Sequence, residues 1–160
     1  MSGGDDVASF RFVHRVPVRF HDLDAMGHAH HSLPLIYIEE ARAAYWREVV
    51  GRPALEHIDY VIGEATVRYH ARITFPDELA VGVRVSRVGG RSFAMQYEVH
   101  SSHGELLASA ETLQVMYDYA SSRSKPVPDA MRRAIVEFET GTQNVSAMPA
   151  DTSPMIPPSR

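Results

Sequence analysis

The sequence contains no cysteine, and this absence excludes several kinds of chemistry at once. A chain without cysteine forms no disulfide, has no thiolate nucleophile and cannot build a cysteine-based zinc site. Any metal would therefore have to be held by histidine and carboxylate side chains. The lack of disulfides is compatible with a reducing compartment, and we expect a cytoplasmic protein.

Long hydrophobic runs and an excess of positive charge are also missing. No apolar segment approaches the roughly 20 residues that are needed to cross a bilayer, so no membrane span is expected. The opening residues, MSGGDDVASF, lack the basic flank and the apolar stretch of a signal peptide. A formal net charge of −4 gives no electrostatic attraction to nucleic acid, which we exclude as a partner.

The composition is that of one globular domain, with 160 residues of which 44% are hydrophobic and 22% charged. Residues 1–7 are small and acidic and are predicted to be flexible. Residues 140–160 carry four prolines and no periodic apolar pattern, which predicts a disordered tail. The folded domain is expected over residues 8–139.

Hydrophobic periodicity predicts an α+β fold. Alternation over 10–20 indicates a strand, in which Pro17 marks an edge or a bulge. A long helix is expected over 33–50, with Ser32 as its N-cap. Four further strand patterns and a short closing helix follow, which gives an approximately five-stranded, mostly antiparallel sheet with one long helix; the strands are expected at 64–73, 79–88, 91–101 and 106–117, and the helix within 123–139.

The segment HDLDAMGHAHHSL, residues 21–33, joins the first strand to the long helix. Its aspartates, Asp22 and Asp24, could simply end local structure, as aspartate often does in turns. Alternatively, one carboxylate acts as a base or nucleophile while N–H groups near His31 and Ser32 polarise a carbonyl oxygen. A tight loop through Gly27 would bring these parts together.

The four histidines of this segment supply enough donors to imitate a metal site. Their spacing is scattered through a loop and does not follow the i, i+4 pattern of helical ligands, so we predict no metal. His31 could be a general acid or base, a hydrogen-bond donor to substrate, or an exposed residue at the helix start.

Other charged groups carry weaker signals. Glu39 and Glu40 are expected to form ion pairs with Arg42 or Arg47 of the same helix. Ser92 could simply begin a strand. Basic residues near turns, such as Arg91 and Lys125, are usually solvated, although they could bind the phosphates of a large anionic molecule such as coenzyme A.

Several motifs in order resemble the 4-hydroxybenzoyl-CoA thioesterase family of hotdog-fold acyl-CoA thioesterases. The stretch VRFHDLDAMGHAHHSLPLIYIEEAR is similar to the family's strand, D-x-D-x-x-G loop and helix ending in E-x-A-R. The stretches VRY with PDEL, VGGRSF and KPVP resemble its second strand, its hairpin and its closing turn. The resemblance covers about residues 12–135.

The resemblance implies a hotdog fold, a sheet wrapped around one long central helix, and hydrolysis of an acyl-CoA or an acyl carrier protein ester. It implies that Asp24 is the catalytic carboxylate, as nucleophile or general base. It also implies that the N–H of His31 donates a hydrogen bond to the thioester oxygen. The His31 side chain occupies the place of a functional histidine in one branch of the family. Coenzyme A is part of the substrate and not a cofactor, and it is expected near Arg91–Ser92 and Lys125. Gly27 and Ser32, near the helix start, are also expected to contact the substrate.

The resemblance further implies a homodimer or homotetramer. The sequence departs from the family pattern at Pro34, where a tyrosine is usual, and at Arg72, where a proline is usual. These departures leave room for a different substrate or a wider pocket, and for a hotdog protein that binds acyl thioesters or a partner without turnover. A further alternative places the catalytic carboxylate at Glu39 or Glu40, as in other hotdog branches.

Overall fold

A computed structural model describes residues 7–52, 57–140 and 146–147. Most of the predicted flexible N-terminus, and the predicted tail apart from 140 and 146–147, lie outside these ranges. The chain divides into two compact units, which are described separately. Unit 1 comprises 1–45, 67–84 and 97–110, and unit 2 comprises 46–66, 85–96 and 111–160.

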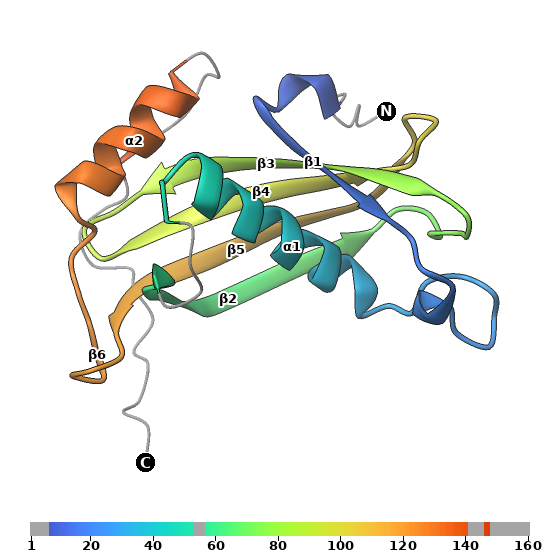
Figure 1. The fold of residues 1–160 in the computed structure, drawn as a ribbon, viewed down its shortest axis with the longest axis horizontal. Coiled ribbons are helices and arrows are strands. Elements are labelled where there is room, and N and C mark those ends of the chain that lie inside the picture. Colours follow the sequence, from blue (N-terminus) through green and yellow to red (C-terminus); the bar gives the residue numbers. More distant parts are fainter. Residues whose placement is uncertain (1–6, 53–56, 141–145, 148–160) are drawn as a thin grey trace. The chain divides into compact units, whose positions relative to one another are not determined.

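The strands follow the order β1-β3-β4-β5-β2, which can be traced in Figure 1. Two short strands lie off this path: β6 pairs with β5 in an antiparallel sense, and β7 pairs with β3 in a parallel sense. The strand bounds are β1 Phe12–Pro17, β2 Tyr60–Tyr69, β3 Glu78–Val88, β4 Ser92–His100, β5 Leu106–Asp118, β6 Arg123–Ser124 and β7 Ser146–Ala147.

Two α-helices occur in the described ranges, and both were expected from the sequence. Helix α1 spans Leu33–Glu48 and α2 spans Asp129–Glu139. Short 3-10 helices, η1 at Val7–Ser9 and η2 at Phe20–Asp22, were not predicted.

Three of the five predicted long strands agree closely with the structure. The strand expected at 10–20 is shorter, Phe12–Pro17, and η2 follows it at Phe20–Asp22. One further strand is displaced. The strand expected at 64–73 runs instead over Tyr60–Tyr69. The observed strand passes through Gly63, since a glycine weakens a strand without ending it. The strand stops because the amides of His70 and Ala71 both donate to the Leu107 carbonyl, which breaks the regular ladder.

In unit 1, β1 pairs antiparallel with β3, from Phe12 opposite Val83 to Pro17 opposite Glu78. Pro17 stands at the last pair of this register, where the missing N–H is least disruptive, as predicted for an edge strand. The ring of Phe12 packs edge-on against Tyr45 of α1, with 5.3 Å between centroids. This contact joins the helix to the first strand of the unit.

In unit 2, the core is built on aromatic rings. Trp46 stacks on Phe93 at 5.5 Å and meets Tyr60 edge-on at 4.8 Å. The end of α2 is held by Glu139, which is 1% exposed and accepts a 3.0 Å hydrogen bond from the Val85 N–H of β3.

Within the described ranges, no helix is both long and apolar enough to cross a membrane.

Unit 1 also contains a position that only glycine can occupy without a shift of its neighbour. A Cβ atom added to Gly82 would lie 2.5 Å from Cγ of the buried Phe10 ring. We therefore expect Gly82→Ala to lower the free energy of unfolding by about 1–3 kcal/mol, the usual cost of overpacking. Gly90→Ala is the matched control, because its Cβ would meet nothing within 4 Å. Equal stability of the two variants in urea unfolding would contradict this account.

Candidate active site

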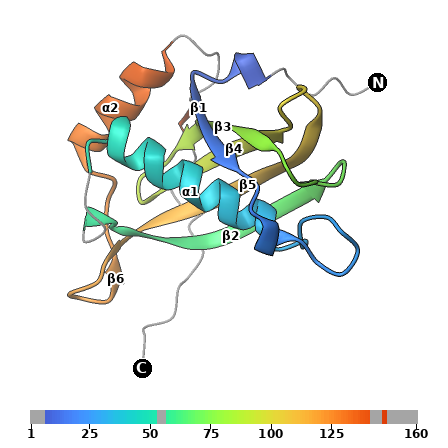
Figure 2. The ribbon, with the colours of Figure 1, turned by 45° about the vertical axis from the view of Figure 1, so that its right-hand side comes forward.

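The segment between β1 and α1 folds into a short loop held by its own hydrogen bonds. Leu23 and Ala29 form an isolated antiparallel bridge, and the N–H of Asp24 donates to the His28 carbonyl at 3.0 Å. Gly27, with φ of 80°, closes the turn by donating its N–H to the Asp24 carbonyl. Figure 2 shows this loop, in blue, next to the start of α1. The glycine predicted to tighten the loop thus does so through a positive φ.

Asp22 ties this loop to the helix. Its carboxylate is 6% exposed, and the same oxygen, Oδ2, accepts a 2.7 Å hydrogen bond from the Tyr37 hydroxyl and a 2.9 Å bond from the Arg19 N–H. The Asp22 carbonyl also accepts a bond from the His30 N–H at 3.0 Å. Asp22 therefore has the structural role that we had considered for both aspartates.

Tyr37 is the helical partner in this contact and is 2% exposed. Burial raises the pKa of its hydroxyl well above the ordinary value of 10.0, and the hydrogen bond to Asp22 raises this pKa further. The hydroxyl therefore remains a proton donor to Asp22 throughout the neutral range.

Asp24 is half-buried and only partly paired. Its Oδ1 accepts a 2.8 Å hydrogen bond from the Met26 N–H, which stabilises the turn, whereas Oδ2 has no partner among the described residues. One carboxylate oxygen is thus held in place and the other remains available, as a base or nucleophile requires.

The start of α1 lies beside this carboxylate. The His31 N–H donates to no described acceptor, while its carbonyl accepts a 2.6 Å bond from the Tyr69 hydroxyl. Ser32 directly precedes the helix, and its hydroxyl lies 2.9 Å from Nδ1 of His30. Its role as an N-cap stays a prediction. The His30 and His31 rings are 3.9 Å apart. A free N–H at a helix start is a ready donor to a polarised carbonyl oxygen.

Asp24 and His31 line one cavity of 320 Å³ that lies entirely within unit 1. Apolar groups from the loop, the helix start and two strand ends form about half of its wall, and titratable side chains form most of the rest. The lining residues are Asp24, Met26, His28, Ala29, His31, Pro34, Tyr69, His70, Ala71, Arg72, Ile73 and Leu107. The volume suits a small ligand or part of a larger one.

The histidines do not gather into a metal site. Among residues 7–52, 57–140 and 146–147, no group of three or more histidine, aspartate or glutamate side chains is arranged to hold a metal ion. Nε2 of His70 lies 2.8 Å from the Ser109 hydroxyl, and His30 contacts Ser32. His28, His31 and His70 line the cavity, while His30 lies against His31 and Ser32.

Arg91, Ser92 and Lys125, the predicted coenzyme A contacts, all belong to unit 2. Arg91 is exposed and donates to the Ser124 carbonyl at 2.6 Å, and Lys125 lies 2.7 Å from Asp59. Ser92 is 3% exposed and begins β4, as its simpler interpretation predicted. Their role in binding coenzyme A stays a prediction.

Glu39 and Glu40, the alternative carboxylates, are exposed on α1 and do not line the cavity. Their expected ion pairs are not formed with any described residue, because Arg47 pairs with Glu48 at 3.2 Å and Arg42 donates to the Tyr97 hydroxyl at 3.4 Å. This expectation was wrong, since the helix turns Arg42 toward buried groups.

Sequence reasoning missed the far wall of the cavity, formed by residues 69–73 and Leu107. Arg72 had attracted notice only as a departure from the family pattern. No local sequence pattern reports this wall, because the end of β2 is set by hydrogen bonds to Leu107, which is distant in the sequence.

Comparison with known proteins places this arrangement in a class. A thioesterase from Thermus thermophilus, solved as a complex with coenzyme A and Zn, matches with a TM-score of 0.76 and 33% identity, covering 82% of this chain and 96% of that one. This likeness identifies the chain as a thioesterase of hotdog fold.

Two curated relatives match most of the chain, and one of them is described as a thioester hydrolase. The acyl-CoA thioester hydrolase YbgC of Escherichia coli O6:H1 is 27% identical over 130 residues, which are 78% of this chain and 95% of YbgC. YsmA of Bacillus subtilis strain 168 is 25% identical over 128 residues, 80% of this chain and 87% of YsmA. Residues 18–135 match the family model of the Thioesterase-like superfamily, so the chain belongs to this superfamily and is a thioester hydrolase.

The Asp22–Tyr37 contact is expected to stabilise the loop measurably. Tyr37→Phe removes a hydrogen bond to a buried carboxylate and should lower the free energy of unfolding at pH 7 by about 1.5–3 kcal/mol. The control is Tyr119→Phe, whose hydroxyl donates to the Tyr60 carbonyl from a side chain that is 60% exposed. A loss no larger than that of the control would contradict the structural role of Tyr37.

The raised pKa of Tyr37 gives this difference a pH dependence. Above pH 10.0, the ordinary pKa, Tyr37 in the unfolded chain releases its proton while Tyr37 in the folded chain retains it. The stability of the natural protein therefore falls through this group as the pH rises, and Tyr37→Phe lacks this contribution. The stability gap between the two proteins should narrow above pH 10, as measured by urea unfolding across pH.

Proposed function

We propose that this protein hydrolyses acyl-CoA thioesters, with Asp24 as the reacting carboxylate and the His31 N–H as the donor to the thioester oxygen. The observation that carries the proposal is the cavity lined by both residues, in which one Asp24 oxygen and the His31 N–H are left without partners in the described chain. Both groups are therefore free to contact a ligand that enters the cavity.

The reaction consumes a thioester and water and yields a carboxylic acid and a free thiol. As a general base, Asp24 takes a proton from water while the water oxygen attacks the carbonyl carbon. As a nucleophile, its carboxylate attacks first, the thiolate leaves, and water then cleaves the resulting anhydride. In both routes the carbonyl oxygen gains negative charge, which the His31 N–H stabilises.

The narrower features of the substrate rest on resemblance. The likeness to 4-hydroxybenzoyl-CoA thioesterases stays a prediction, as does the choice between coenzyme A and an acyl carrier protein as the thiol. The relative from Thermus thermophilus was solved with coenzyme A, and YbgC is described as an acyl-CoA thioester hydrolase. These descriptions support coenzyme A as the first carrier to test.

A homo-oligomer is part of the proposal. Strand β2 ends the strand order and has a largely exposed surface, including Ile62 at 42% and Tyr69 at 56% exposure. An edge strand with apolar exposed side chains favours pairing with a second copy. Light scattering coupled to gel filtration would decide between a monomer and a dimer or tetramer.

The role of Asp24 is tested by Asp24→Asn, which retains the size of the side chain and removes its charge. Loss of a general base or nucleophile should lower kcat by about 10²–10⁴-fold, measured as thiol release from a panel of acyl-CoAs with Ellman's reagent. The matched control is Glu39→Gln on the same panel, because Glu39 is exposed and lies outside the cavity. A retained kcat in Asp24→Asn together with a reduced kcat in Glu39→Gln would show that Glu39 of α1, and not Asp24, is the catalytic carboxylate.

A substitution at His31 can separate the contribution of its backbone N–H from that of its imidazole. His31→Ala keeps the N–H that polarises the carbonyl, so we expect most of the turnover to survive, with a decrease in kcat of about tenfold or less. A decrease as large as that of Asp24→Asn would assign the main catalytic role to the imidazole instead. Assays with and without EDTA should agree, because neither proposed group needs a metal.

A further inference from the structure

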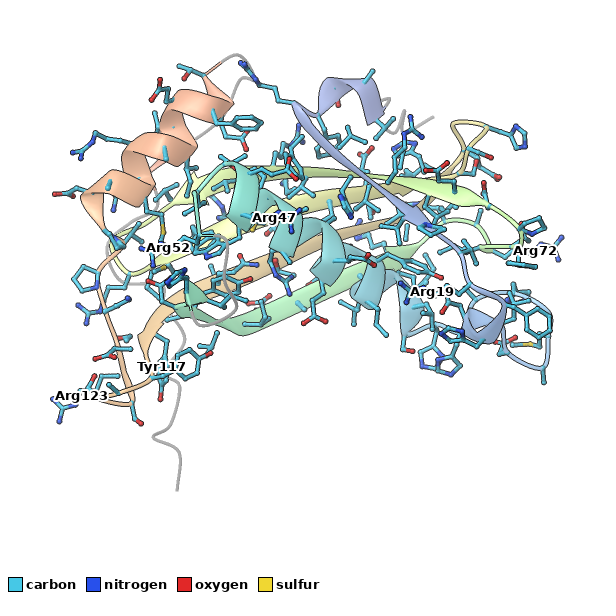
Figure 3. The ribbon with its side chains drawn as sticks, viewed as in Figure 1. Arg19, Arg47, Arg52, Arg72, Tyr117 and Arg123 are labelled. Atoms are coloured by element: carbon cyan, nitrogen blue, oxygen red, sulfur yellow. The ribbon has the colours of Figure 1, made fainter. Side chains whose placement is uncertain are left out.

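One positively charged side chain on the wall of the unit 1 cavity, that of Arg72, has no role in the proposed hydrolysis. Arg72 lines the same cavity as Asp24, yet it forms no ion pair or hydrogen bond with any described residue. Figure 3 labels Arg72 on the connection that follows β2. Guanidinium groups have five donors in a planar fork that matches a carboxylate or phosphate, and an unpaired one in a ligand cavity points to an anionic ligand.

The backbone on both sides of Arg72 is held in place. Before it, the N–H groups of His70 and Ala71 donate to the Leu107 carbonyl at 2.9 and 3.1 Å. After it, the Ile73 carbonyl accepts a 2.8 Å bond from the Ala29 N–H of the loop that carries Asp24. The connection is therefore fixed relative to the loop, while the Arg72 side chain is left unpaired.

The positive charge of Arg72 affects which acyl groups the cavity can accept. Among the described residues that line it, Asp24 is the only acidic one, and an acyl group with its own carboxylate would be repelled by Asp24. Arg72 offsets this repulsion, and His28 and His70 add polar groups to the wall. The apolar side chains of Ile73 and Leu107 provide contact for methylene groups between the thioester and a distal charge.

We propose that Arg72 binds a carboxylate at the far end of the acyl group, so that the substrates are thioesters of dicarboxylic acids. The inference rests on the proposed function, since it places the thioester at Asp24. A phosphate of coenzyme A presents the same anionic chemistry. However, the pantetheine arm separates the phosphates from the thioester, which the proposed function places at Asp24, in the same cavity as Arg72.

The test compares substrates of equal shape and different charge. Adipoyl-CoA is paired with 6-methylheptanoyl-CoA, and glutaryl-CoA with 5-methylhexanoyl-CoA, because an isopropyl group has the branching and about the size of a carboxylate without its charge. Uncatalysed hydrolysis is subtracted in each case. We expect the natural protein to prefer the carboxylated member in kcat/KM, and Arg72→Gln to lower this preference by about tenfold, as loss of a charge-assisted hydrogen bond predicts.

Two further variants make the result specific. Arg72→Lys keeps the charge without the planar fork and should retain part of the preference. Arg68→Gln removes another exposed arginine of unit 1 that does not line the cavity, and it should leave the preference unchanged. Thermal unfolding of each variant verifies that the fold is retained. An equal loss of preference in Arg68→Gln would overturn the assignment to Arg72.

The same pairs as N-acetylcysteamine thioesters, which carry no phosphate, distinguish the two sources of the anion. The Arg72 effect should persist on them. If Arg72→Gln instead slows both CoA thioesters of a pair equally and neither N-acetylcysteamine thioester, the anion is a CoA phosphate and the inference is wrong. Turnover of neutral acyl-CoAs with no preference in any variant refutes the inference alone, whereas no hydrolysis of any thioester refutes the proposed function as well.

Discussion

The hydrogen bond between the Tyr37 hydroxyl and the Asp22 carboxylate is the contact on which the geometry of the site depends. It links the second turn of α1 to a loop that has few apolar side chains of its own to bury. Because the same Asp22 oxygen also accepts the Arg19 N–H, the loop is tied at its entry and to the helix through one atom. Burial raises the pKa of Tyr37, so this donor keeps its proton at any pH where the protein would act.

This contact divides the work between two aspartates that stand two residues apart. Asp22 is buried, accepts two hydrogen bonds at Oδ2 and does not line the cavity, so it contributes structure. Asp24 is half-buried, uses one oxygen to hold its own turn, and presents the other toward a cavity. A carboxylate that is positioned and faces a cavity is suited to chemistry, whereas one that is buried and hydrogen-bonded to the neighbouring helix is suited to holding a loop. The environments, and not the residue type, separate the two roles.

The sequence alone predicted much of this arrangement, for physical reasons that differ from element to element. Period-2 and helical patterns located β3, β4, β5 and α1 closely, because each buries one regular face. The displacement of β2 followed from hydrogen bonds to Leu107, a contact between distant parts of the chain that no local pattern reports.

The site was predicted in the same uneven way. Asp24, Gly27 and His31 lie on one short segment and could be recognised together, as residues of a motif. The division of roles between Asp22 and Asp24 depended on Tyr37, fifteen residues away, and the cavity wall at Tyr69 and Arg72 came from a distant part of the chain. Unpaired donors and acceptors of this kind become visible only when the tertiary partners of every group are known.

The most direct test of the central claim is a crystal structure of Asp24→Asn with an intact acyl-CoA bound. The account predicts that the thioester carbonyl oxygen lies about 3 Å from the His31 nitrogen, with the side chain of residue 24 next to the carbonyl carbon and the acyl group in the cavity of unit 1. A thioester bound elsewhere, or with its oxygen directed away from the start of α1, would contradict it.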